Sequence, residues 1–296
     1  MSSIVDIHPH VISTDTKRYP LNPLGGIQST WSRERPTSFE ALVTAMDEAR
    51  VDKAAIVQAS TAYGHDNSYV AEAIAACPGR FTGVFSVDVL ADDAVEKMRH
   101  WRSRGFGGMR LFTTGSTMPG QAIWFDDPRS FPAWTFAGEA GIPICMQMTS
   151  DGFAALRALM HKFPNVRIIL DHCARPHLID GPPFAADAGL FGFADNPNVF
   201  LKVTPLNFAP PSWGKATPEG FLGKLLAAFG AARLAFGSNF PATEGTLTEI
   251  LAKARDAFSF AGDEERSWIF GRTAERLYPM LAATGDAGDQ ATRRQA

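Results

Sequence analysis

The amino-acid sequence predicts an α/β barrel of eight parallel strands, the (β/α)8 or TIM barrel, formed by a single domain. Eight short β-rich apolar runs alternate with segments of helical spacing, and this alternation implies parallel βαβ units. Eight such units close into a barrel. An open doubly wound sheet is the alternative, but no GxGxxG or GxxxxGK[ST] motif follows a strand, which argues against its nucleotide-binding versions.

The strand candidates come at regular intervals along the chain. They are residues 4–8 (IVDIH), 54–60 (AAIVQAS), 81–89 (FTGVFSVDV), 107–113 (GGMRLFT), 142–148 (IPICMQM), 166–172 (VRIILDH), 198–204 (NVFLKVT) and 233–239 (RLAFGSN). Helical spacing is found at 38–50, 66–77, 91–104, 131–140, 152–163, 185–196, 217–230, 246–258 and 263–278. Ser38, Asp92 and Thr217 are helix-start residues for three of these segments.

Long loops follow the first, fourth, sixth and seventh strands, whereas the connections from helices into strands are mostly short. Active sites of barrels are built on the loops after strands. These loops carry the aromatic residues Tyr19, Trp31, Trp124 and Trp213, which a disordered linker would rarely keep. The loops are therefore expected to be functional.

Composition limits the possible partners. The net charge is -3, from 28 basic and 31 acidic residues, which favours neither nucleic acid nor an anionic membrane. No apolar run has the length of a membrane span. The three cysteines show no CxxC spacing, which is typical of buried thiols in a reducing cytoplasm. We expect a cytoplasmic barrel over residues 1–280, a polar tail over 281–296, a small-molecule substrate, and loop aromatics that could also serve a homo-oligomer.

Polar residues stand at several of the expected strand ends. His8 and His10 are two residues apart, so their side chains point the same way if they continue the strand. Arg110 lies between Met109 and Leu111, and an arginine in an apolar run needs a partner. Either a structural ion pair or a clamp on a substrate carboxylate or carbonyl explains it.

Three further strand-end residues complete the candidate site. His172 shares its parity with Ile168 and Leu170 and is expected to face inward if they do. Gln147 ends the fifth strand and Asn239 ends the eighth. Because the carboxyl ends of barrel strands meet at one face, these side chains are expected to lie together there.

Five motifs resemble one known superfamily. They are VDIHPH, GGMRL, ILDHCARP, FGSNFP and IFGRTAERLYP, and they span residues 5–279. In this order they resemble the amidohydrolase superfamily, in the branch of 2-pyrone-4,6-dicarboxylate lactonase, sugar-acid lactonases and sulfomuconolactonase. The resemblance implies a lactone-hydrolysing barrel.

The resemblance assigns roles residue by residue. His8 and His10 match the pair on the first strand and are expected to act in acid–base work. Arg110 matches a substrate-contacting arginine, and His172 matches a histidine that polarises the carbonyl. Asn239 stands where most relatives keep an aspartate that orients or deprotonates the attacking water.

This sequence departs from the metal-binding members of the superfamily. Gln147 stands where those members have a histidine, and Asn239 replaces the carboxylate. A zinc site requires three or four good ligands, which two histidines and two amides do not supply. The expectation is therefore no metal cofactor, with a weak divalent ion at His8 and His10 as the alternative.

Asn239 leaves several reactions open, because an amide cannot act as a general base. It could position water in a lactone hydrolase whose base is a histidine. It could instead disfavour water in a lactone isomerase, and the resemblance includes a galactarolactone isomerase with this substitution. A decarboxylase like the aminocarboxymuconate-semialdehyde branch and a non-catalytic binding barrel are the remaining alternatives.

Substrates of the related branch are often acids, so cationic and polar side chains on the loops are candidates for binding them. Arg175 is favoured because it follows His172 by three residues. Gln147, His65 and Tyr19 are the other expected substrate-binding residues. His65 follows the second strand, and Tyr19 lies on the long first loop.

Overall fold

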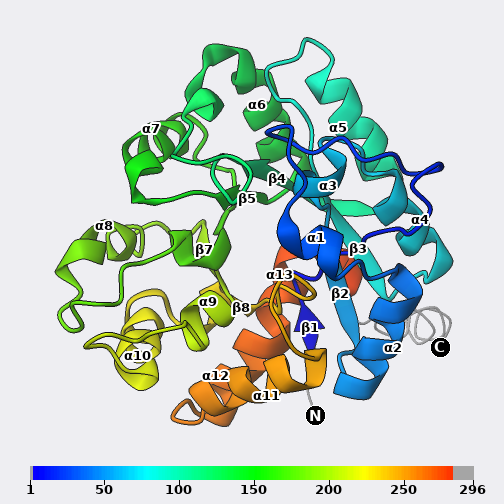
Figure 1. Cartoon of the computed structure of the whole chain (residues 1–296). Helices are drawn as coiled ribbons and strands as arrows, with labels where there is room; N and C mark the ends of the chain where they lie inside the picture. The colour runs from blue at the N-terminus through cyan, green and yellow to red at the C-terminus, as the bar shows by residue number, and fades with distance from the viewer. Residues whose placement is uncertain (1–2, 283–296) are drawn as a thin grey trace, which may run out of the picture.

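A computed structural model describes residues 3–282, and within them eight parallel strands form one sheet in chain order (Figure 1). The strands are β1 (Val5–Asp6), β2 (Lys53–Val57), β3 (Phe81–Phe85), β4 (Phe106–Phe112), β5 (Ile144–Gln147), β6 (Ile168–Leu170), β7 (Val199–Val203) and β8 (Leu234–Phe236). The backbone N–H of Ile7 donates to the carbonyl of Phe236 at 3.1 Å, which brings β8 back to β1. The predicted single-domain (β/α)8 barrel and its eight strands are confirmed.

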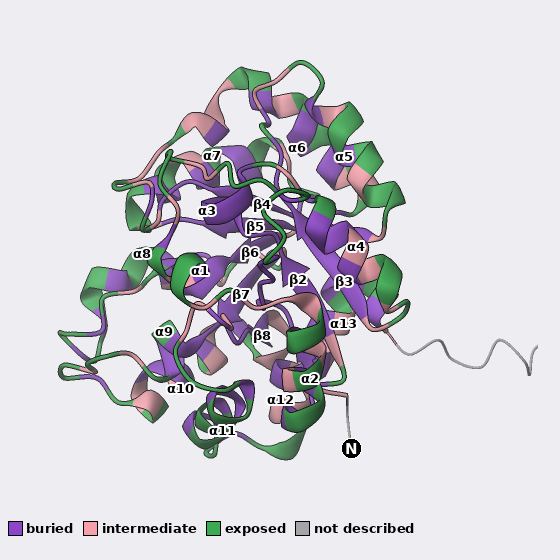
Figure 2. Ribbon diagram, turned by 45° about the vertical axis from the view of Figure 1, so that its right-hand side comes forward, coloured by how far each residue is buried: buried purple, intermediate pink, exposed green. Residues whose placement is uncertain are grey.

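Helices surround the strands (Figure 1). They are α1 (Thr30–Glu34), α2 (Phe39–Ala49), α3 (Ser60–Tyr63), α4 (Ser68–Ala76), α5 (Ala94–Ser103), α6 (Phe131–Ala140), α7 (Phe153–Lys162), α8 (Ala188–Phe191), α9 (Pro205–Phe208), α10 (Pro218–Phe229), α11 (Leu247–Ala257), α12 (Asp263–Ser267) and α13 (Thr273–Leu277). Figure 2 shows buried strands at the centre and exposed outer helix faces. No helix among the described residues is long and apolar enough to span a bilayer.

Local chemistry explains where several helices begin. The Ser38 hydroxyl accepts the N–H of Ala41 at the start of α2, and Thr217 caps α10 in the same way. At α5 the helix starts at Ala94 rather than directly after Asp92. The segment predicted as one helix over 263–278 is divided, because the π-helical turn Trp268–Arg272 separates α12 from α13.

The core consists of two layers of apolar side chains. One layer lies between the sheet and the helices. The other fills the barrel interior, and its strand residues are Val5, Ile7, Ala55, Val57, Val84, Cys145, Ile169, Phe200 and Ala235. Tyr278 and Leu281 join this inner layer from the end of the chain.

The C-terminal segment closes one end of the barrel. Lys53, the first residue of β2, donates through Nζ to the carbonyl of Leu281 at 2.7 Å. Leu281 is fully buried, so the barrel extends past residue 280, where the polar tail was expected to begin. The rest of that tail, from residue 283, lies outside the described residues. The amino ends of the strands are thus covered, which leaves the carboxyl ends for a site.

Candidate active site

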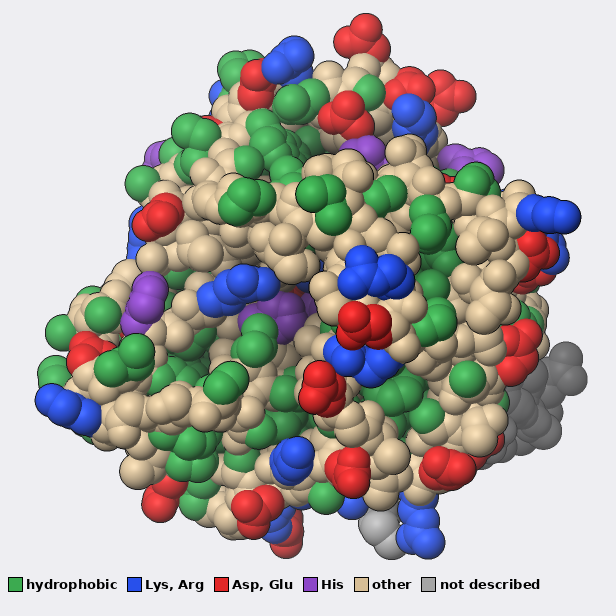
Figure 3. Space-filling view, viewed as in Figure 1, with side chains coloured by type: hydrophobic (Ala, Val, Ile, Leu, Met, Phe, Trp, Pro, Cys, Tyr) green, Lys and Arg blue, Asp and Glu red, His purple; other side chains and the backbone are tan. Residues whose placement is uncertain are grey.

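A cavity of about 300 Å³ opens at the carboxyl ends of the strands. Its lining includes the expected residues His10, Arg110, Gln147, His172, Arg175 and Asn239, together with Trp31, Ala59, Ser60, Thr61, Phe112, Gly115, Ser116, Leu206 and Ala242. Figure 3 shows a hollow in this face with histidine at its floor and Lys or Arg side chains beside it. Trp31 of α1 stacks on His10, with ring centroids 5.1 Å apart. The first loop therefore covers part of the cavity.

Arg110 is anchored inside the barrel by a carboxylate that the sequence reasoning missed. Its Nε donates to Asp171 Oδ2 at 2.7 Å, and its Nη2 donates to Gln147 Oε1 at 2.9 Å. Its remaining nitrogen, Nη1, bonds to none of the described residues. Because Arg110 also lines the cavity, Nη1 is the donor left for a ligand.

A second missed residue, Lys202 on β7, pairs with the same carboxylate. Its Nζ lies 2.8 Å from Asp171 Oδ1, and both side chains are fully buried. Burial alone would raise the pKa of Asp171, but the charges of Lys202 and Arg110 outweigh it and hold that pKa below its usual range. The signal in the sequence was a lysine in the apolar run NVFLKVT, of the same kind as Arg110.

The three histidines form one cluster. The ring centroid of His8 lies 4.9 Å from that of His10 and 4.8 Å from that of His172. Burial, reinforced by nearby cations, lowers the pKa of His10 and of His172 to about 3 and that of His8 well below its usual value. All three imidazoles are therefore neutral at pH 7.

Hydrogen bonds fix the orientation of two of these rings. The Nδ1 of His10 lies 2.7 Å from the carbonyl of Val57, which can only accept, so Nδ1 carries the proton and Nε2 the lone pair. The Nδ1 of His172 bonds to the Thr204 hydroxyl at 2.7 Å. His8 is fully buried beneath the cavity, and neither of its ring nitrogens has a hydrogen-bond partner among the described residues.

His172 reaches the cavity by a route that the parity argument did not foresee. Ile168 and Leu170 pack outward against the helices, and Ile169 faces the barrel interior, so the condition on which His172 was expected to face inward is not met. After Leu170 the chain enters a left-handed turn in which residues 172–175 have φ between 53° and 58°. This turn brings both His172 and Arg175 to the cavity lining.

Asn239 follows a similar change of direction after β8. It has φ 54°, a left-handed conformation that asparagine tolerates better than most residues. Its Nδ2 donates to the Thr243 hydroxyl at 3.1 Å, and the side chain lines the cavity. Gln147 lines it too, although its amide oxygen is occupied by Arg110.

Two expected substrate-binding residues lie elsewhere. His65 bonds through Nδ1 to Ser86 Oγ and lines a separate cavity beside Trp101. Tyr19 is buried against Tyr69, with ring centroids 4.8 Å apart, and contributes to another surface depression. Neither side chain is among those that line the cavity at the barrel mouth; Tyr19 lies beside residues of α4 and His65 beside residues of α5.

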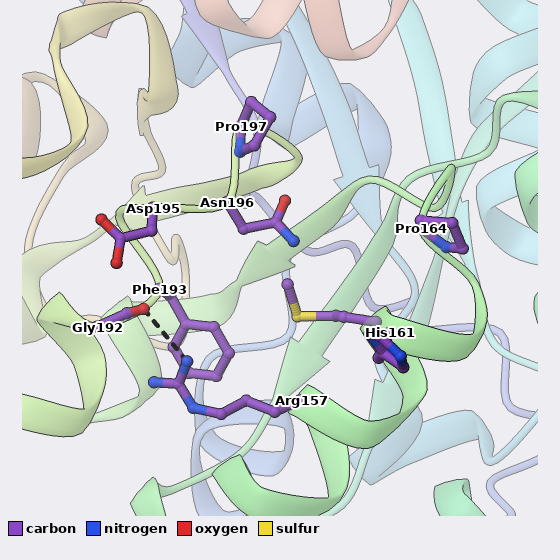
Figure 4. A pocket seen from close by; sticks show the side chains of 9 residues that line it. Arg157, His161, Pro164, Gly192, Phe193, Asp195, Asn196 and Pro197 are labelled. Carbon is purple, nitrogen blue, oxygen red and sulfur yellow. Dashed lines mark hydrogen bonds between the residues drawn. The ribbon is translucent and has the colours of Figure 1, made fainter.

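A further depression lies between α7 and the α8 region (Figure 4). Arg157 crosses it, donates to the carbonyls of Gly189 and Gly192, and lies 3.9 Å from the ring centroid of Phe193. Its guanidinium is engaged in joining the two helices, so it offers little to a ligand.

Comparison with known proteins assigns the family. The model of the family described as amidohydrolase matches residues 5–280. The chain belongs to the amidohydrolase family. The prediction of an enzyme of this superfamily is thereby confirmed, and the catalytic roles of its residues are taken up below.

One curated relative of this amidohydrolase is named as a lactonase. The chain is 28% identical over 176 residues to an L-fucono-1,5-lactonase of Burkholderia ambifaria, a match over 55% of this chain and 59% of the lactonase. The chain thus spans less than two thirds of that curated relative. A candidate 2-pyrone-4,6-dicarboxylic acid hydrolase of Pseudomonas putida has the same fold, with TM-score 0.76 and 21% identity over 95% of this chain and 99% of that one.

A Burkholderia multivorans amidohydrolase, described in one structure with bound zinc, matches with TM-score 0.75 and 22% identity over 94% of this chain and 99% of its own. In the present amidohydrolase, Gln147 Oε1 is occupied by Arg110 and Asp171 by two cations. Among residues 3–282 no group of three or more His, Cys, Asp or Glu side chains is arranged to hold a metal ion.

Proposed function

We propose that this amidohydrolase hydrolyses the ester bond of a small carboxylated lactone and does so without a metal ion. The observation that carries the proposal is Arg110, whose Nη1 is left for a ligand in a cavity that also contains His10 and His172. The similarity to a named fuconolactonase supports the reaction class.

Arg110 is suited to stabilise the oxyanion that forms when the lactone carbonyl is attacked. It is held in place before reaction by Asp171 and Gln147, so little reorganisation is needed. A preorganised donor of this kind contributes about 3–4 kcal/mol. A Thr204 hydroxyl that donates to Nδ1 of His172 would leave Nε2–H of this neutral ring as a second donor.

His10 is the candidate base, because its Nε2 carries the lone pair. It takes a proton from water as the water oxygen bonds to the carbonyl carbon. The proton returns to the ring oxygen when the carbon–oxygen bond of the lactone breaks. Asn239 orients the water. His8 lies beside the other two rings and does not line the cavity, so it acts on the reaction through them rather than on the substrate.

Arg175 is the candidate partner of a substrate carboxylate. It is exposed at the cavity, and its guanidinium makes no ion pair or hydrogen bond with the other described residues. A guanidinium matches the planar geometry of a carboxylate, which favours acidic over neutral lactones.

Proton NMR of the purified protein with sugar-acid, muconate-derived and pyrone-carboxylate lactones tests the proposal. Each lactone is incubated with and without a chelator. Ring opening that survives the chelator is the expected result. Loss of turnover in the chelator would contradict the metal-free reaction, and no change on any lactone would contradict the reaction class.

A lactone isomerase is the second candidate, because Asn239 is an amide where a base would activate water. In that reaction a substrate hydroxyl attacks the carbonyl, and NMR shows ring migration without opening. The Asn239→Asp variant supplies a carboxylate and is expected to raise opening relative to migration by about 10-fold or more. Asn198→Asp is the matched control, since Asn198 bonds to the Pro164 carbonyl at the opposite end of β7. Equal effects of both variants would contradict the role of Asn239.

A further inference from the structure

The helix α1 has five residues and lies on the long loop after β1. A helix this short is not stable on its own in water, so neighbouring elements must hold it in place. Trp31 of this helix is half-buried and lines the cavity. The position of Trp31 therefore depends on what anchors the two ends of α1.

The amino end of α1 is anchored to the segment after β2. The backbone N–H of Ser29 donates to the carbonyl of Thr61 at 3.2 Å, and the hydroxyls of these two residues lie 2.8 Å apart. The Ser29 hydroxyl also donates to that of Ser32 at 2.8 Å. Because Thr61 belongs to α3 and lines the cavity, this anchor fixes α1 to one side of the cavity.

The carboxyl end of α1 is anchored to the segment after β8, residues 237–246, by the side chain of Arg35. Its Nε donates to the carbonyl of Pro241 and its Nη2 to the carbonyl of Ala242, both at 3.1 Å. Its Nη1 lies 3.4 Å from Glu244, but that side chain is 86% exposed, so the ion pair contributes little. The planar guanidinium presents two donors side by side, which suits two successive carbonyls better than an ammonium does.

Between the two anchors, Trp31 stacks on His10, with ring centroids 5.1 Å and planes 30° apart. An indole in this place covers one face of the imidazole with apolar surface. The backbone N–H of His10 donates to the carbonyl of Phe240 at 2.8 Å, which ties it to the segment after β8 as well. The candidate base and the ring that covers it are thus both fastened to the segment after β8.

We propose that Arg35 is a positioning residue that holds Trp31 over His10. Its guanidinium fastens α1 to the segment after β8, and the fixed indole keeps the imidazole oriented and shielded from solvent. Arg35 is not among the described residues that line the cavity, so it acts through Trp31 rather than on the substrate. The effect on turnover rests on the proposed lactonase function with His10 as base, whereas the anchoring of α1 does not.

Hydrogen exchange measured by mass spectrometry tests the anchor without a substrate. The wild-type protein, Arg35→Met and Arg33→Met are compared over residues 29–37 and 237–246. Arg33 is the matched control, since it lies on the same helix, is exposed and pairs with the adjacent Glu34. Arg35→Met is expected to speed exchange in both segments by about 10-fold or more, and Arg33→Met to leave it unchanged. Equal exchange in the two variants would overturn the anchor.

Kinetics on a lactone identified by NMR test whether Arg35 acts through Trp31. Arg35→Met is expected to lower kcat by about 10–100-fold with a smaller change in KM, because the base is misplaced while Arg110 and Arg175 remain. In a Trp31→Ala background the same substitution should cost less than about 2-fold, because the covering ring is already gone. Equal losses in the two backgrounds would contradict the proposal, since Arg35 would then act independently of Trp31.

The pH profile separates this role from one in folding alone. Burial is the main cause that lowers the pKa of His10, so uncovering its ring should raise that pKa and move the acid limb of kcat/KM to higher pH. The charged neighbours of His10, which are Arg110, Lys202 and Asp171, are unchanged in Arg35→Met, so the shift reports access of solvent. A variant that only yields less active protein, with the acid limb in its wild-type place, would argue for a folding role and against the proposal.

If Arg35→Met does not fold, as judged by circular dichroism, Arg35→Lys supplies the test. Lysine keeps the charge without the paired donors of the guanidinium, so exchange and the acid limb should change in the same direction by a smaller amount. Wild-type values of both in this variant would contradict the proposal. A wild-type protein that opens no lactone would contradict the proposed function instead, and hydrogen exchange alone would then decide whether Arg35 anchors α1.

Discussion

At the scale of single residues, Asp171 joins parts of the candidate site that come from three strands. It follows β6 and bonds to Arg110 of β4 and Lys202 of β7. Burial alone would raise the pKa of Asp171, but both cations stabilise its ionised form and hold that pKa below its usual range. The guanidinium of Arg110 has three nitrogen atoms, so it can bond to Asp171 and to Gln147 and still present a donor to a ligand.

Arg110→Lys tests whether the guanidinium is needed. Lysine keeps the charge, but a single ammonium cannot bond to Asp171 and Gln147 and still present a donor to the cavity. The value of kcat/KM for the lactone is expected to fall by about 10²–10³-fold, as for loss of one oxyanion donor. Arg167→Lys is the control, since Arg167 bonds to backbone carbonyls away from the cavity. Similar kinetics for the two variants would contradict the role of the guanidinium.

Of the charged residues Arg110, Lys202 and Asp171, only Arg110 was predicted from the sequence. Arg110 and Lys202 show the same pattern, a cation within an apolar strand, but only Arg110 also matches a superfamily motif to which a role is attached. Asp171 stands within ILDHCARP, yet its pairing depends on β4 and β7, which are distant in sequence. Periodicity cannot predict which strand-end charges from different strands will meet.

At the scale of elements, the turn after β6 positions two cavity residues. Four successive residues, His172 to Arg175, adopt the left-handed conformation, and none of them is glycine. Asn207 donates through Nδ2 to the carbonyl of His172 at 2.9 Å, and Thr204 bonds to its ring. The start of α9, directly after β7, thus holds the turn in a conformation that its own residues disfavour.

Ala174→Gly measures the strain in this turn. Ala174 is buried and has φ 58°, where alanine is less stable than glycine by about 1–2 kcal/mol. Relief of this strain should offset the loss of the methyl group, so the free energy of unfolding should change little. Ala137→Gly, at an equally buried position in α6, has no strain to relieve and should cost about 1–2 kcal/mol. Urea denaturation of the two variants decides the point, and equal losses would argue against a strained turn.

The pattern of elements was predictable, whereas the geometry at their ends was not. Apolar runs and helical spacing predicted all eight strands, because the buried faces of a barrel impose that pattern. The strand pairing of β6 ends at Leu170 and that of β8 at Phe236, so His172 and Asn239 lie beyond the regular pairing. Left-handed turns without glycine leave no clear signal in the sequence.

At the scale of the whole molecule, the two ends of the barrel differ in what they contain. The amino ends of the strands are closed by Tyr278 and Leu281, and the carboxyl ends hold the cavity. Although the chain has a net charge of -3, the cations Arg110, Lys202 and Arg175 gather at or beneath the cavity. This local excess suits an anionic substrate and adds to burial, the larger cause, in lowering the pKa of the buried histidines.

Neutral buried histidines make the stability of the whole barrel depend on pH. The pKa of His10 and of His172 is lowered to about 3 in the folded protein and that of His8 is lowered well below its usual value, whereas in the unfolded chain these residues bind protons below about pH 6.5. Their contribution to stability is thus present above pH 6.5 and is lost as the pH falls toward 3, because the unfolded state takes up more protons. Each histidine contributes a slope of at most about 1.4 kcal/mol per pH unit.

Urea denaturation between pH 8 and pH 5 should therefore show a free energy of unfolding that decreases below about pH 6.5. His172→Asn is expected to be less stable at pH 8 but to show a flatter decrease, because one of the protonation sites is gone. His161→Asn, at an exposed position on α7, is the control and should keep the wild-type slope.

Burial also raises the pKa of Asp6. The folded protein therefore takes up one proton at acid pH, which partly offsets the loss of stability caused by the histidines. A stability that stays constant from pH 7 to pH 5 would mean that the histidine cluster is protonated in the folded barrel, and the assignment of His10 as a neutral base would fail with it.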